Sequence, residues 1–249
     1  MIDYLKGIWV AMKGIPVTLG VSALAVFLGI VLGLVLALMN LSRSRVLKVI
    51  SKVYVEVVRG TPMLVQALIL AYGIPQLLQS LGSSFKWPYL VIPAIIVCGM
   101  NSGAYVAEVI RSGLQAVDKG QREAALSLGM TSGMAMRLVI IPQAIKIVLP
   151  SLGNEFITLI KETSILSYVG VVEITRRGTL WNAATFKTFQ AYIGVAIVYM
   201  MLTIPLSYLI KYLEKRMGTD KKAHRARAPS PMQRRVTSDD RSQRPCQEL

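Results

Sequence analysis

Five polar or charged side chains lie close together in a largely apolar stretch at residues 146–170, and their types could bind a polar or charged ligand. Amides and hydroxyls form hydrogen bonds, a carboxylate pairs with an ammonium group, and a lysine pairs with a carboxylate. At about 100° per residue they share one helical arc of about 120°, which excludes Phe156, Leu159 and Ile160. This polar arc consists of Asn154, Glu155, Thr158, Lys161 and Glu162.

A second, shorter stripe has the same character. Asn101, Tyr105 and Glu108 fall on one face of a predicted helix. Ionisable residues within a membrane are candidates for a functional site by default. Structural ion pairing is the alternative, with Lys161 paired to Glu162 or to Glu108. Asn154 and Glu155 are therefore the stronger candidates for substrate contact.

The chain shows no recognisable set of residues for enzymatic catalysis or for a bound cofactor. Its one histidine, His224, lies in a polar tail, and the distant Cys98 and Cys246 predict neither a disulfide nor a metal site. No G-x-x-x-x-G-K-[ST] segment occurs, so a Walker A nucleotide site is absent from the sequence. We expect no cofactor, and any ATP hydrolysis would belong to another protein.

The elements that position these residues are predicted to be membrane-spanning helices. Of 249 residues, 53% are hydrophobic and 16% are charged, against about 25% charged residues in soluble domains. A span needs about 20 residues, and residues 14–42, 60–85, 87–107 and 188–210 carry no charge. A central charge costs roughly 2.5–3.5 kcal/mol, so 146–170 spans only if its polar arc faces protein or water. We predict an all-α integral membrane protein with spans near 16–38, 62–80, 88–108, 146–170 and 188–210.

Residues 1–217 form the predicted transmembrane domain. Within its first span, Ala25, Gly29, Gly33 and Ala37 recur every four residues and allow close approach of another helix. Residues 44–58 are amphipathic and are expected to lie along the inner surface, while Pro62 suits the start of the next helix. Residues 218–249 contain almost no large apolar groups and are predicted to be a disordered basic tail.

The distribution of Lys and Arg predicts the orientation. With the N-terminus outside, the inner segments 40–52, 109–146 and 211–249 hold 20 Lys and Arg in total. The outer segments 1–14, 81–87 and 172–187 hold 6. Cytoplasmic loops carry the excess of these residues. We therefore expect the C-terminus to be cytoplasmic.

The long inner loop, residues 109–146, has helical signals. Asp118 can cap a short helix through Glu123, and Gly129 fits its end. Thr131 or Ser132 can cap a second short helix, which Pro142 limits. Ala124 and Ala125 give a slim surface that a partner protein can grip, although a solvated loop without a partner has the same pattern.

The same residues resemble a known signature. Glu123-Ala124-Ala125, Gly129 and Val139-Ile140-Ile141-Pro142 are similar to the EAA motif of ABC-importer permeases, with Val and Ile in place of the usual Ile and Leu before the proline. The segments 56–66, 107–113, 142–144 and 161–164 resemble the polar amino-acid permeases of the histidine/glutamine/arginine type. The resemblance covers roughly residues 10–215.

The resemblance implies a permease of the type I ABC-importer fold in the bacterial cytoplasmic (inner) membrane. One of two identical or related permease subunits, it would pair with two ATPase subunits inside and an extracytoplasmic solute-binding protein that delivers an amino acid. The expected ATPase-coupling residues are Glu123, Ala124, Ala125 and Gly129. An ion-coupled secondary transporter is the main alternative; a membrane adaptor does not explain the polar arc, and a nucleic-acid partner for the basic tail has no groove-reading element to support it.

Overall fold

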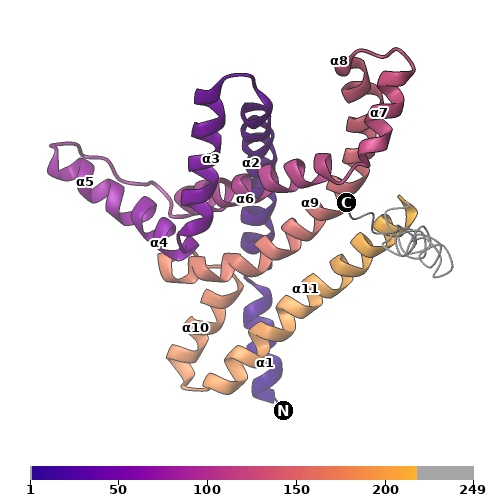
Figure 1. The fold of residues 1–249 in the computed structure, drawn as a ribbon. Helices are drawn as coiled ribbons and strands as arrows, with labels where there is room; N and C mark the ends of the chain where they lie inside the picture. Colours follow the sequence, from indigo (N-terminus) through magenta and orange to yellow (C-terminus); the bar gives the residue numbers. More distant parts are fainter. Residues whose placement is uncertain (1, 218–249) are drawn as a thin grey trace, which may run out of the picture.

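The computed structural model describes residues 2–217, and every regular element in this range is a helix (Figure 1). The predicted tail, residues 218–249, lies outside the described residues. Five helical stretches in the described part are long and apolar enough to cross a membrane. They are Ile2–Leu41, Met63–Ser80, Val91–Gln115, Ser132–Val169 and Thr188–Arg216.

The centre of the fold is the contact between α2 (Ile15–Leu41) and α6 (Val91–Gln115). A Cβ on Gly29 would lie 2.6 Å from Ser102 Oγ, and a Cβ on Gly33 would lie 2.6 Å from the Cβ of Val106. Only glycine permits this approach of the two helices. The close approach predicted from the small-residue stripe is confirmed.

The N-terminal region differs from the prediction. The outer segment before the span at 16–38 received no helix in the prediction, but residues Ile2–Met12 form α1, which a two-residue turn joins to α2. α1 packs on α11 (Thr188–Arg216), where Gly194 lies against the backbone of Gly7. An ion pair of 2.6 Å between Lys187 Nζ and Asp3 Oδ2 links the same two regions. The missed signal is the spacing of small residues at Gly7 and Ala11, both buried.

Helix α3 (Arg45–Gly60) confirms the predicted amphipathic helix, but not its placement along the inner surface. α3 folds back beside α2 (Figure 1). The Ser51 hydroxyl donates to the Leu36 carbonyl at 2.8 Å, and the Tyr54 hydroxyl donates to the Met100 carbonyl of α6 at 2.9 Å. These two hydrogen bonds connect α3 to both central helices.

After α3 the chain breaks at Thr61-Pro62, and the second apolar stretch begins at Met63, as Pro62 predicted. This stretch consists of α4 (Met63–Leu68), a π-helical turn (Ile69–Gly73) and α5 (Ile74–Ser80). The break is secured by the Gln66 amide, which donates to the Val58 carbonyl at 2.8 Å. Trp87, in the following loop, donates to the Leu70 carbonyl at 2.9 Å.

The fourth apolar stretch begins earlier than predicted. Thr131 caps α8 (Ser132–Ala135), as expected, but the chain then continues through a π-helical turn (Met136–Ile140) into α9 (Ile141–Glu162). Pro142 does not limit the second helix, because it occupies the first turn of α9, where a missing N–H costs no helical hydrogen bond. A 3₁₀ segment (Thr163–Val169) follows α9 and leads to α10 (Ile174–Thr185).

Candidate functional site

The polar arc of α9 is turned away from the core of its own chain. Asn154, Thr158 and Lys161 are exposed, and Glu155 and Glu162 are half-buried. Leu159 and Ile160, predicted to lie outside the arc, are fully buried. The helical-wheel prediction is therefore confirmed in its geometry: the polar residues share one face of α9, on which three are exposed and two are partly covered.

The second stripe, on α6, is more varied than the sequence indicated. Asn101 is 5% exposed and lies inside the helix packing, whereas Tyr105 is exposed. The Arg59 guanidinium stacks over the Tyr105 ring at 5.2 Å from its centroid. Glu108 pairs with Arg111 one turn later on the same helix. The three residues thus form a line along α6 but occupy three different environments.

The proposed internal ion pairs of Lys161 are not formed in the structure. Among the described residues, salt bridges join Lys52 to Glu56, Arg111 to Glu108 and Lys187 to Asp3. Glu108 uses both carboxylate oxygens on Arg111. Lys161 reaches neither Glu108 nor Glu162 at ion-pair distance. The charged groups of the arc therefore form no salt bridge with one another or with Glu108.

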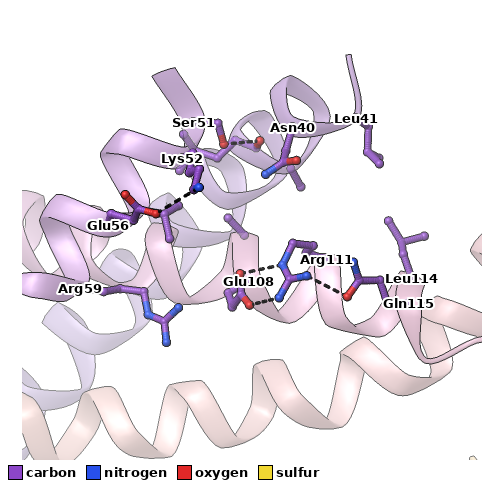
Figure 2. A pocket seen from close by; sticks show the side chains of 14 residues that line it. Asn40, Leu41, Ser51, Lys52, Glu56, Arg59, Glu108, Arg111, Leu114 and Gln115 are labelled. Atoms are coloured by element: carbon purple, nitrogen blue, oxygen red, sulfur yellow. Dashed lines mark hydrogen bonds and ion pairs between the residues drawn. The ribbon is translucent and has the colours of Figure 1, made fainter. Parts of the chain in front are cut away.

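A cavity of about 470 Å³ lies between the ends of α2, α3 and α6, and Figure 2 shows its lining. Here it is called the charged cleft. Sequence reasoning gave no role to four of its charged residues. The four are Lys52, Glu56, Arg59 and Arg111. The first three follow the spacing i, i+4, i+7 on α3, and this spacing was the sequence signal that they share one face of the helix.

The coupling loop, residues 118–142, projects from one end of the molecule, beyond the end of α6 (Figure 1). Asp118 caps α7 (Lys119–Ser127) by accepting from the Gly120 N–H at 2.7 Å, as predicted. Gly129 has φ +82°, a conformation that favours glycine. Glu123 and Ala124 are exposed, but Ala125 is buried, so the predicted slim surface has only one of its two alanines. Leu128, which sequence reasoning passed over, is 80% exposed beside them.

A buried carboxylate at the opposite end of α9 was also missed. Glu173 caps α10 by accepting from the backbone N–H groups of Thr175 and Arg176 at 2.7 and 2.6 Å. The Tyr199 hydroxyl of α11 donates to the same carboxylate at 2.9 Å. Burial raises the pKa of Glu173, and these hydrogen bonds oppose the shift. The capping position before Ile174 was its sequence signal.

Comparisons with known proteins agree with this architecture. Residues 29–219 match the family described as the binding-protein-dependent transport system inner membrane component. The chain is 40% identical over 206 residues to the probable amino-acid permease protein YxeN of Bacillus subtilis strain 168, covering 83% of this chain and 90% of that one. It is 36% identical over 209 residues to the arginine transport system permease protein ArtQ of the same organism, covering 84% and 93%.

Solved structures share the fold. A crystal structure of an amino acid ABC transporter with histidines matches with a TM-score of 0.79 and 43% identity, covering 85% of this chain and 96% of that one. An inward-facing structure of the MetNI methionine ABC transporter matches with a TM-score of 0.63 at 19% identity, which supports the fold alone. The chain belongs to the family of binding-protein-dependent transport system inner membrane components and is a multi-pass permease subunit.

Proposed function

We propose that this permease subunit imports amino acids as part of an ATP-driven complex. The observation that carries the proposal is the polar arc of α9, which groups exposed amide, hydroxyl and ammonium groups with two half-buried carboxylates on one face. A zwitterion needs donors for its carboxylate and acceptors for its ammonium group, and this face offers both. Relatives named as amino-acid and arginine transport proteins support the same substrate class.

A second permease subunit, identical or related, completes the path. Charged and polar groups within a membrane face a protein interior or water, because contact with lipid costs several kcal/mol per group. Three of the five arc residues are exposed in a single chain, so we propose that another subunit supplies the opposite wall. The two central stripes, on α9 and α6, then provide the substrate-path residues, which are Asn154, Glu155, Thr158, Lys161, Glu162, Asn101, Tyr105 and Glu108.

The coupling loop is the proposed contact for ATPase subunits. Glu123 and Ala124 are exposed on α7, and Gly129 fixes the turn that follows. A separate binding protein would deliver the amino acid at the other end of the molecule. Rocking of near-rigid helices then exposes the path to each side in turn.

The proposed orientation places the N-terminus outside and the coupling loop in the cytoplasm, as the Lys and Arg counts predict. A single cysteine at Ser127 should react with a membrane-impermeant maleimide only in inverted vesicles, and one at Ser83 only in right-side-out vesicles. The reverse pattern would overturn the orientation.

The test of the function is uptake of labelled L-arginine and L-glutamine into proteoliposomes that contain the permease, its ATPase and its binding protein. Asn154→Leu and Glu155→Leu should each lower uptake about tenfold or more, since a lost hydrogen bond to a charged group costs roughly 1.5–3 kcal/mol. Ile145→Leu, an exposed apolar position of α9 outside the arc, is the matched control.

Unchanged uptake in both arc variants would remove the arc from the path. Uptake by the permease alone, driven by an ion gradient and independent of ATP, would contradict the proposed mechanism and indicate an ion-coupled transporter. Assembly of each variant with the ATPase, checked by size-exclusion chromatography, separates a transport defect from a folding defect.

A further inference from the structure

The charged cleft lies apart from the arc of α9. Its walls come from α2, α3 and α6, and no described residue of α9 lines it. Lys52, Glu56 and Arg59 extend from α3, and Glu108 and Arg111 extend from α6 (Figure 2). Two cations and one anion on α3 therefore face one cation and one anion on α6 across the cavity.

The ion pairs of the cleft run along its walls and not across it. Lys52 Nζ lies 3.7 Å from Glu56 Oε1 on α3, with side chains 72% and 65% exposed. On α6, Arg111 holds Glu108 and donates to Gln115 Oε1 at 2.8 Å. In the described chain no salt bridge joins α3 to α6. Exposed pairs of this kind contribute only about 0–1 kcal/mol, so a ligand that carries both charges can exchange with them.

Helix α3 separates this charged face from an apolar one. Val46, Ile50, Val53 and Val57 are exposed on one side of the helix, whereas Lys52, Glu56 and Arg59 occupy another. In a membrane protein the exposed apolar side suits lipid, and the charged side suits water or protein. The cleft is therefore expected to be a wet compartment of the protein, which favours a dissolved ligand over a lipid.

The apolar lining and the position of the cleft further restrict the kinds of ligand that it suits. Leu36 and Ala37 are buried at its base, and Asn40 and Gln115 add amide groups at its rim. Tyr105 and Glu108, two residues of the α6 stripe, lead into it, because Arg59 stacks on Tyr105 and Glu108 lines the wall. The end of α6 then continues directly into the coupling loop.

We propose that the charged cleft is a second binding site for a free amino acid, at the coupling-loop end of the path and separate from the arc of α9. The α-carboxylate pairs with Arg59 or Arg111, the ammonium group pairs with Glu56 or Glu108, and the apolar floor holds the side-chain stem. For the class of ligand, this inference rests on the proposed function. A phosphatidylethanolamine headgroup shares the same charges, so the experiment must distinguish these two sources.

The experiment measures equilibrium binding of tritiated L-arginine and L-glutamine to the purified permease–ATPase complex in nanodiscs. The wild type should bind two molecules of the transported amino acid per permease chain, and a variant combining Arg59→Gln with Arg111→Gln should bind one. The affinity of the cleft should fall about tenfold or more for each lost charged partner. A variant combining Arg45→Gln with Lys48→Gln removes two α3 cations outside the cavity lining and should keep both sites.

Three results would overturn the inference and leave the proposed function intact. The wild type could bind only one amino acid per permease chain, or the Arg59→Gln, Arg111→Gln variant could bind as many as the wild type. In the third, native mass spectrometry would show that the cleft retains phosphatidylethanolamine, while amino-acid binding is the same with and without the two arginines. Failure of the proposed function looks different, since the complete system would then show no ATP-driven amino-acid uptake. The Asn154→Leu variant is the reciprocal control, because it should bind the amino acid normally in the cleft and more weakly at the arc of α9.

Discussion

Glu173 illustrates how a single buried side chain joins two helices of this permease. Its carboxylate caps α10 through two backbone N–H groups and binds Tyr199 of α11. Burial raises its pKa because the charged form loses hydration, and the hydrogen bonds only partly oppose this effect. The group therefore stabilises the fold by binding a proton more tightly in the folded state than in the unfolded state.

The sign of the pH dependence follows from that shift. The contribution of Glu173 is fully present below the unfolded pKa, near 4.3, and is lost as the pH rises through the higher folded pKa. Glu173→Gln lacks this titration, so the stability advantage of the wild type over the variant should be largest near pH 4 and shrink toward pH 8. Thermal unfolding in detergent across this range measures it. A stability advantage of the wild type that grows with pH would show that the hydrogen bonds lower the pKa of Glu173 more than burial raises it.

At the scale of elements, the α2–α6 contact depends on the absence of side chains. A Cβ on Gly33 would lie 2.6 Å from the Cβ of Val106 and 2.9 Å from the Gly103 carbonyl oxygen. Gly33→Ala should lower the free energy of unfolding by about 1–3 kcal/mol through overpacking. Gly20→Ala is the matched control, since a Cβ there meets no atom within 4 Å. Unfolding in SDS measures both; equal stability of the two variants would contradict the tight contact.

A substitution in the coupling loop is expected to impair transport without lowering stability. Glu123→Lys reverses an exposed charge on α7 without disturbing the Asp118 cap or Gly129. We expect the variant to assemble normally in the membrane but to lose most substrate-stimulated ATP hydrolysis and uptake. Lys119→Ala, on the same helix and outside the signature, should retain both activities. Normal uptake by Glu123→Lys would refute the docking role of α7.

For the whole molecule, the number of apolar stretches, the polar arc and the capped α7 could be predicted from the sequence because each depends on local signals. Charge-free length indicates a span, helical spacing places Asn154 and Leu159 on different faces, and Asp118 caps its own helix. Packing between distant segments gave no such signal. The folding of α3 onto α2, the inward turn of Ala125 and the grouping of Arg59 with Arg111 depend on tertiary contacts, so sequence reasoning missed them.

The most direct test of the account is the water accessibility of the α9 arc in the assembled complex. With Cys246 replaced by serine and Cys98 buried, Asn154→Cys and Thr158→Cys should react with a small charged methanethiosulfonate reagent, and the transported amino acid should slow both reactions. Leu159→Cys, at a fully buried position of the same helix, should react far more slowly. Arc cysteines that react no faster than the one at residue 159, or that the amino acid does not protect, would contradict the claim that α9 lines the path.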